Sequence, residues 1–249
     1  MKISRVIIKN KYTTVLLCFI VVLIFFLYPR NKIIIWVWER NENLTFLNRD
    51  TVVAYYAGSV ILENGRMVIS KRVQPLKLNS DTEIIPVIRI DNFDTVKELT
   101  APRMKQVEDF IIQTCDQNLV VGCQIDFDVK SSERDVYKVL ISSVRERLPK
   151  NLPLSMTALV SWCDTYSWIN DTKIDFAVPM FYRLGSDEQM IRGGYTGKTF
   201  MESPKCSSAI GVTTDEPIPK AKYIGNRDIY IFNPHSWTES ELKRILKII

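Results

Sequence analysis

The chain of 249 residues contains one histidine, His235, and five cysteines. A single histidine cannot build a multi-histidine metal site, and no cysteines stand at zinc-binding spacing, so the sequence predicts no metal. No cysteine lies in the setting of a nucleophile, which argues against a thiol enzyme. No Gly-x-Gly-x-x-Gly turn or Walker loop follows an early strand. A nucleotide-binding fold therefore lacks its motif, and no cofactor is expected.

The chain also lacks a strong charge imbalance, because its net charge is only +5. Basic residues are spread along the sequence, and several of them precede the apolar N-terminal run, so nothing favours nucleic-acid binding. With 46% hydrophobic and 24% charged residues, the chain can bury one large core. One domain is the expectation, since α/β barrels reach about 250 residues.

Residues Tyr12 to Tyr28 form an uncharged run that follows Lys2, Arg5, Lys9 and Lys11. The run lies at the short end of the range that spans a membrane, and the basic flank predicts that the N-terminus stays in the cytoplasm. A cleaved signal peptide is the alternative, but no small-x-small site follows the run. We therefore expect a cytoplasmic tail and single-pass inner-membrane anchor over residues 1–31, with a barrel domain over residues 32–249 on the extracytoplasmic side.

Apolar and β-branched runs predict eight strands in the remainder of the chain. Helical patterns follow the third, fourth and last of them, at Arg103–Gln117, Glu133–Leu148 and Thr238–Ile249, and Ser131 or Ser132 is the expected cap of the second. This order predicts a (β/α)8 TIM-like barrel, with a doubly wound open sheet as the alternative. The strands are Ile33–Trp38, Thr51–Gly58, Glu83–Asp91, Leu119–Asp128, Leu152–Val160, Ile174–Tyr182, Ser208–Thr213 and Asp228–Asn233.

Between the second and third strands, residues 60–69 contain an Asn-Gly turn at Asn64 and Gly65. Asn-Gly between two apolar runs is typical of a β-hairpin. The hairpin is expected as an insertion in place of a crossover helix.

The fourth strand carries the strongest functional signal. Because side chains alternate along a strand, Gln124, Asp126 and Asp128 share one face, and Cys123 shares the other with its apolar neighbours. The two aspartates lie roughly 6.6 Å apart at Cα, close enough to raise one another's proton affinity. Such a pair suits acid/base chemistry, although capping of the next helix or pairing with an arginine would also account for it.

Aromatic and polar side chains end most of the other strands. Aromatic rings stack on sugar faces, and carboxylates and amides bind sugar hydroxyls, so a carbohydrate fits these strand ends better than a small anion. The alternative is that individual tryptophans have only a structural role in the hydrophobic core. The expected substrate-binding residues are Trp36, Trp38, Arg89, Gln124, Trp162 and Met180, with Tyr182 beside the aspartates.

Three segments resemble a bacterial family of uncharacterised proteins, domain of unknown function 3142. They are residues 122–128, 154–163 and 178–185, and the resemblance covers roughly Trp36 to the C-terminus. A more distant resemblance joins the chain to chitinase-like glycoside hydrolases of family 18, whose fourth strand carries Asp-Gly-x-Asp-x-Asp-x-Glu and whose sixth carries Met-x-Tyr. Both resemblances imply the barrel fold.

The family 18 resemblance implies site residues as well. Asp126 falls on the second inner aspartate of the motif and Asp128 on the catalytic glutamate, while Met180 and Tyr182 match the sixth-strand pair. Gln124 replaces one carboxylate of the motif, and Asp128 is one methylene shorter than glutamate. Because of these departures, the resemblance implies the fold more strongly than it implies the catalytic activity.

On this basis Asp128 is the expected general acid, with a raised pKa, and Asp126 the ionised stabiliser. An N-acetyl group of the substrate could be oriented by Asp126 and Tyr182; otherwise Glu39 or Asp91 would supply a second carboxylate. The predicted function is a membrane-anchored glycoside hydrolase acting on a polysaccharide or envelope glycan.

Several alternatives stay open. One is a non-catalytic carbohydrate-binding barrel in polysaccharide or envelope assembly, another a magnesium site at the two aspartates, and His235 could touch the barrel mouth. Export would permit disulfides, and Cys163 with Cys206 is the expected pair, whereas Cys123 reads as a small buried hydrophobe.

Overall fold

The computed structural model describes residues 31–63, 65–92, 100–164, 167–185, 188, 201–219 and 224–249. By its contacts the chain divides after Asn31, and the second unit is Lys32–Ile249. None of the helices in the described ranges combines the length and apolarity that a membrane span requires. The predicted anchor at Tyr12–Tyr28 lies outside these ranges.

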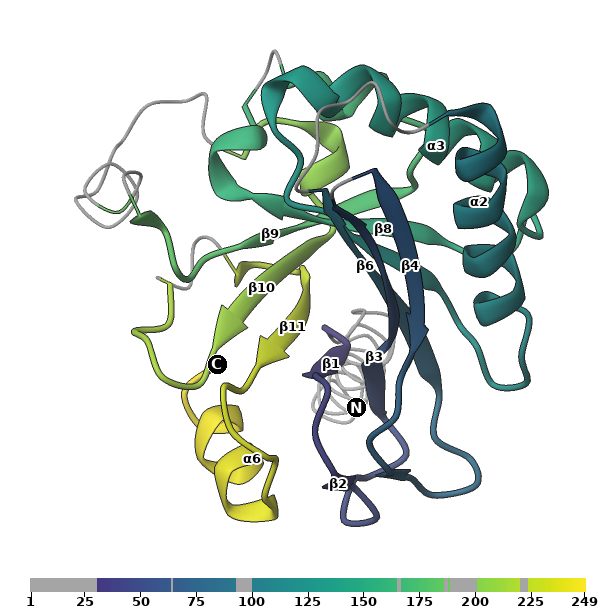
Figure 1. Cartoon of the computed structure of the whole chain (residues 1–249). Coiled ribbons are helices and arrows are strands. Elements are labelled where there is room, and N and C mark those ends of the chain that lie inside the picture. The colour runs from purple at the N-terminus through teal and green to yellow at the C-terminus, as the bar shows by residue number, and fades with distance from the viewer. Residues whose placement is uncertain are drawn as a thin grey trace, which may run out of the picture. The chain divides into compact units, whose positions relative to one another are not determined.

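Eight parallel strands form a closed barrel (Figure 1). The first strand β1 pairs with β3 on one side and with the last strand β11 on the other, which closes the ring. This confirms all eight predicted strands and excludes the open doubly wound sheet. Their bounds are β1 Ile33–Val37, β3 Thr51–Glu63, β6 Ile84–Asn92, β7 Cys123–Asp126, β8 Leu154–Leu159, β9 Phe176–Met180, β10 Ala209–Thr213 and β11 Asp228–Phe232.

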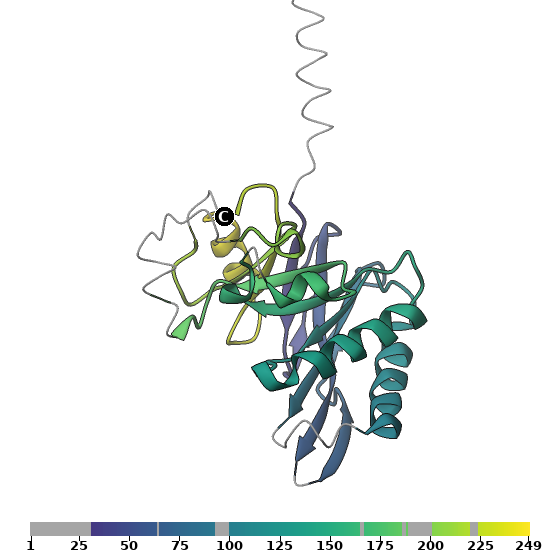
Figure 2. The same cartoon turned by 90° about the horizontal axis from the view of Figure 1, so that it is seen from above.

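The helical layer is incomplete. Helix α2 (Ala101–Cys115) follows β6, α3 (Arg134–Arg147) follows β7, and α6 (Glu239–Leu246) follows β11, as predicted. Figures 1 and 2 show α2 and α3 side by side on one flank of the barrel, where Arg147 forms ion pairs with Glu108 and Asp109. Short 3-10 turns stand between β8 and β9, at η3 (Val160–Trp162) and η4 (Trp168–Asp171), and before β10, at η6 (Pro204–Cys206).

Side-chain alternation divides the core into two layers. Inside the barrel, Ile34 and Trp36 of β1 pack with Val87 and Tyr230. On the outer face, Ile35 and Val37 join the larger cluster beneath the helices. The fourth barrel strand follows the same rule, since Cys123, Ile125 and Phe127 lie in the outer cluster.

The inserted hairpin is an extension of the second barrel strand. Strand β3 runs for 13 residues and pairs beyond Gly58 with antiparallel β4 (Arg66–Lys71). A register shift between Tyr56 and Gly58 allows the strand to continue past the barrel wall. The predicted strand ended at Gly58, because the hairpin was expected to be a separate element.

Two local predictions are corrected, and one pair of short strands was not predicted. Strand β7 begins at Cys123, because Leu119 has a φ of 65° that interrupts the extended backbone. The turn η2 (Ser131–Glu133) precedes α3, and neither Ser131 nor Ser132 caps it; Glu133 accepts the backbone N–H of Lys130 instead. A two-stranded parallel pair, β2 (Glu42–Asn43) with β5 (Leu76–Lys77), was not predicted. By contrast, Thr238 caps α6 as expected, accepting the N–H of Glu241.

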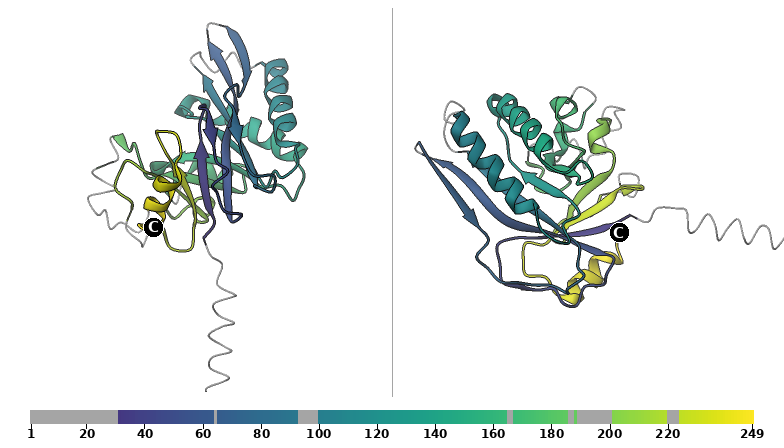
Figure 3. Two further views of the ribbon diagram at one scale, coloured as in Figure 1. Left: turned by 90° about the horizontal axis from the view of Figure 1, so that it is seen from below. Right: turned by 90° about the vertical axis from the view of Figure 1, so that its right-hand side faces the viewer.

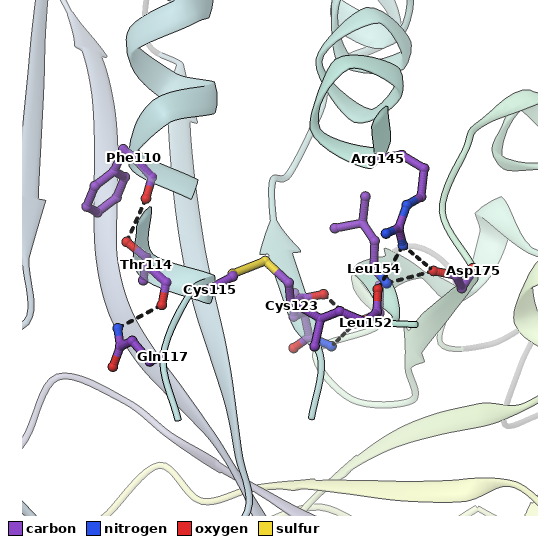
Figure 4. The surroundings of a disulfide bond; sticks show 11 residues. Phe110, Thr114, Cys115, Gln117, Cys123, Arg145, Leu152, Leu154 and Asp175 are labelled. Atoms are coloured by element: carbon purple, nitrogen blue, oxygen red, sulfur yellow. Dashed lines mark hydrogen bonds and ion pairs between the residues drawn. A yellow bond between two sulfur atoms is a disulfide. The ribbon is translucent and has the colours of Figure 1, made fainter. Parts of the chain in front are cut away.

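Two disulfides cross-link the outer layer, and one of them includes a barrel strand. Cys163 pairs with Cys206 at a Cα separation of 5.8 Å, which confirms that expected pair. Cys123 is not a free hydrophobe, because it pairs with Cys115 at the end of α2, 5.9 Å away at Cα. Figure 4 shows this second bridge joining α2 to the start of β7, the strand that carries the two aspartates.

Candidate active site

A cavity of about 340 Å³ opens at the carboxyl ends of the barrel strands. Strand ends of a parallel barrel meet at one face, so residues far apart in sequence converge there. Its lining combines aromatic, apolar and charged side chains. They are Trp36, Trp38, Arg89, Asp126, Asp128, Thr157, Leu159, Met180, Tyr182, Arg183 and Phe232.

Asp126 ends β7 and is 9% exposed. Its Oδ1 accepts a hydrogen bond of 2.6 Å from the hydroxyl of Thr157 on β8. Burial raises the pKa of Asp126 from 3.8 to about 6, the charge of Asp128 adds to the rise, and the Thr157 hydrogen bond and the Arg89 charge oppose it. Asp126 is therefore a carboxylic acid that can hold a proton close to neutral pH and release it.

Asp128 lies two residues beyond Asp126, past the end of the strand, and its side chain is exposed at the cavity. The burial of the two aspartates therefore differs from the expectation. Burial acts on Asp126, which was expected to be the ionised group, whereas Asp128 faces solvent. The reason is strand length: β7 ends at Asp126, so only that carboxyl is enclosed by neighbouring strands.

Arg89 on β6 links the carboxylates of this face. Its Nε lies 3.0 and 2.9 Å from the two carboxylate oxygens of Asp91, and its Nη1 lies 3.9 Å from Oδ2 of Asp126. The Asp91 hydrogen bond raises the pKa of Arg89, so the guanidinium stays charged. Asp91 thereby aims a fixed positive charge at Oδ2 of Asp126.

Aromatic rings form another part of the cavity lining. Tyr182 stacks on Phe232 with ring centroids 5.7 Å apart, and Trp38 meets the edge of Phe232 at 6.4 Å. Burial raises the pKa of Tyr182 well above its ordinary value, so its hydroxyl remains a neutral hydrogen-bond donor. Trp36, only 2% exposed, forms the cavity floor. Flat apolar rings beside carboxylates suit a sugar ring, which has apolar faces and hydroxyl edges.

Two predicted substrate-binding residues lie elsewhere. Gln124 is fully buried beneath the cavity, where its Oε1 accepts the indole N–H of Trp36 at 2.7 Å and its Nε2 donates to Ser155 at 3.2 Å. It supports the floor and does not line the cavity. Trp162 packs against Trp168 in the outer core, because η3 turns the chain away from the barrel mouth.

The other carboxylates considered from sequence do not line this cavity. Glu39 accepts the backbone N–H groups of Val73 and Gln74, and Asp91 is held by Arg89. His235 is exposed and is not among the lining residues. No group of three metal-ligating side chains occurs within the described ranges. Among the described lining residues, the carboxylates are Asp126 and Asp128.

Thr157, Leu159, Arg183 and Phe232 line the cavity but were not predicted as site residues. Thr157 and Leu159 alternate on β8 in the same way as the aspartates on β7, and that period-2 pattern was available. Thr157 could have been predicted from its position on the same strand face as other cavity-lining residues of β8. No comparable signal marks Phe232, an apolar residue at the end of an apolar strand.

No family model and no curated protein matches the chain. Among solved structures, the chain is similar to the spore cortex-lytic enzyme SleL of Bacillus cereus, with a TM-score of 0.46 and 16% identity over 74% of this chain. The chain spans about half of that protein, 51% of its length. A likeness at this level carries no argument about activity, so the resemblances drawn from the motifs stay predictions, and the closed ring of eight parallel strands alone defines the fold.

Proposed function

We propose that the protein is a glycoside hydrolase whose proton donor is Asp126. The observation that carries the proposal is a buried carboxylic acid with a pKa of about 6, set in an aromatic-lined cavity at the carboxyl ends of a parallel barrel. A general acid works best when its pKa lies near the working pH. A cavity that only bound a sugar would not need a carboxyl group buried at this cost.

The reaction uses the two lining carboxylates in different roles. Asp126 gives its proton to the glycosidic oxygen while the bond from that oxygen to the anomeric carbon breaks. Water adds to the anomeric carbon, and Asp128 accepts the proton that this water loses. Exchange with solvent returns a proton to Asp126 and removes one from Asp128, so the net reaction consumes one water and yields two sugar ends.

The surrounding groups support this chemistry. Arg89 faces the oxygen of Asp126 that becomes negative, and the Tyr182 hydroxyl can donate to a sugar oxygen in the cavity. The stacked pair of Tyr182 and Phe232 supplies an apolar face for a sugar ring. Trp38, half-buried at the rim, supplies another.

We further propose that the barrel acts on a polysaccharide or envelope glycan outside the cytoplasm, anchored by the N-terminal segment. Two disulfides support an exported location, because structural disulfides form and persist in oxidising compartments. Cysteine oxidation states measured on protein from the native envelope fraction test this part. Free thiols at all four positions would contradict it.

The test of catalysis compares the full-length protein with Asp126→Asn, Asp128→Asn and Asp50→Asn on a panel of neutral, N-acetylated and uronate-containing oligosaccharides. Asp126→Asn keeps the shape and removes the proton, so turnover of a cleaved glycan should fall roughly 100- to 10,000-fold with binding largely kept. Asp128→Asn should also impair turnover. Asp50, an exposed carboxylate outside the cavity lining, is the matched control and should leave it unchanged.

The pH profile gives an independent check. The active form carries a proton on Asp126, so activity should decline as the pH rises above about 6. A non-catalytic binding barrel predicts a different pattern: no glycan is cleaved by the wild type, and Trp38→Ala weakens binding more than Asp126→Asn does. That pattern would remove the hydrolase proposal.

A further inference from the structure

Thr157 is nearly buried, at 5% exposure, on the inner face of β8. Its hydroxyl oxygen lies 2.6 Å from Oδ1 of Asp126. No sequence pattern assigned this residue a role, and the proposed reaction does not use it directly. Its position beside the proposed acid raises the question of which carboxyl oxygen carries the proton.

The direction of this hydrogen bond follows from what each group can satisfy. Oδ1 of Asp126 is the acceptor that the described residues offer to the Thr157 hydrogen. If protonated Asp126 donated to Thr157 instead, the buried hydroxyl hydrogen would have no acceptor, and an unsatisfied buried donor is costly. Thr157 therefore donates, and Oδ1 stays unprotonated in both states of the acid.

The proton must then reside on the other oxygen, Oδ2. This oxygen faces Nη1 of Arg89 at 3.9 Å, and Asp91 fixes the direction of that guanidinium. When the proton leaves, negative charge develops on Oδ2 opposite a fixed positive charge. One hydrogen bond thus decides where the proton sits before transfer, and one cation stabilises the same atom afterwards.

We propose that Thr157 is a positioning residue that directs the acidic proton of Asp126 to Oδ2. The inference rests on the proposed role of Asp126 as proton donor. It goes further by naming the reacting atom and the group that selects it. Thr157 acts through Asp126 and is assigned no contact with substrate.

Other groups also act on the titration of Asp126 and must be held constant in a test. They come from β6, the segments after β7 and β9, and helix α3, and they act on Asp126 through their charges. They are Arg89, Asp91, Asp128, Tyr182 and Tyr137. Substitutions confined to Thr157 leave all of them in place.

The experiment compares Thr157→Val with Thr157→Ser in the full-length protein. Valine keeps the volume and the methyl group but loses the hydroxyl, whereas serine keeps the hydroxyl and loses the methyl group. A role in hydrogen bonding predicts that serine behaves like the wild type and valine does not. A role in packing predicts the reverse order, so the two variants separate the explanations.

The first readout is the titration of Asp126 without substrate, followed by carboxyl ¹³C NMR and assigned by the signal that Asp126→Asn removes. The wild type should titrate near pH 6. Loss of a hydrogen bond to the ionised form should move the midpoint of Thr157→Val up by about one pH unit, and Thr157→Ser should match the wild type. Equal midpoints in the wild type and Thr157→Val would overturn the proposal whatever the activity.

The second readout is kinetic, on any glycan that the wild type cleaves. For Thr157→Val, kcat should fall roughly 10- to 100-fold with KM nearly unchanged, and the alkaline limb of the profile should move up with the midpoint. Thr157→Ser should stay within about threefold of the wild type. If the midpoint moves as expected but no glycan is cleaved, the hydrolase proposal fails while the placement of the proton stands.

Discussion

Replacing Asp126 with asparagine should stabilise the protein at neutral pH. Folding raises the pKa of this carboxyl from 3.8 to about 6, because burial disfavours its charged form. A raised pKa in an acid means that the folded state binds the proton more tightly than the unfolded state does. The stability this gives is fully present below about pH 3.8 and is lost as the pH rises through about 6.

The size of the effect follows from the same values. The difference between 3.8 and about 6 corresponds to about 3 kcal/mol of unfolding free energy at 25 °C. Asparagine resembles the protonated acid in shape and charge, and its carbonyl oxygen can still accept the Thr157 hydrogen bond. At pH 7 the variant should therefore be more stable by up to about 3 kcal/mol, which for a domain of this size raises Tm by about 6 to 12 °C.

Thermal unfolding of the wild type and Asp126→Asn between pH 4 and pH 7.5 measures this. The two Tm curves should converge near pH 4, separate progressively as the pH rises to about 6, and stay a constant distance apart above it. Asp50→Asn is the matched control, because this exposed carboxylate lies outside the cavity lining and its replacement should change stability by only about 0.5 kcal/mol or less. A difference between wild type and Asp126→Asn that stays constant across this pH range would refute the reasoning.

Three further predictions concern the frame of the site. A methyl group on Gly211 would lie 2.9 Å from Cη2 of Trp36, so Gly211→Ala should cost about 1–3 kcal/mol in a denaturant melt, whereas Gly122→Ala, whose nearest neighbours lie 3.6 Å away, should cost less. Joint replacement of Cys163 and Cys206 by serine removes a cross-link with a sequence separation of 43 and should lower the unfolding free energy by about 4 kcal/mol. A variant that melts at the same temperature as the oxidised wild type would contradict this. Removal of residues 1–31 should give a folded domain that needs no detergent, which circular dichroism and gel filtration would check against the full-length chain.

The barrel could be predicted because its signal is repeated along the chain. Eight apolar runs predicted eight strands, and the alternation around Ile125 correctly assigned the inner and outer faces of β7. Strand ends were less certain, because hydrophobicity does not reveal a backbone turn such as that at Leu119.

The candidate site was predicted only in part, for a related reason. Sequence spacing placed Asp126 and Asp128 on one face, but the difference in their burial depends on which carboxyl group the neighbouring strands enclose. That is a property of the closed barrel, not of the motif. Trp162 shows the same limit, since a 3-10 turn directly after a strand redirects a side chain that the strand pattern places at the mouth.

The pairing of β1 with β11 has a consequence for how the chain reaches its final form (Figure 3). Because the chain is synthesised from its N-terminus, β1 is available early and β11 last. Until Asp228–Phe232 arrives, one side of β1 and one side of β10 expose unpaired backbone groups that can pair with other chains. Truncations within the last 22 residues should therefore favour aggregation over a smaller folded product.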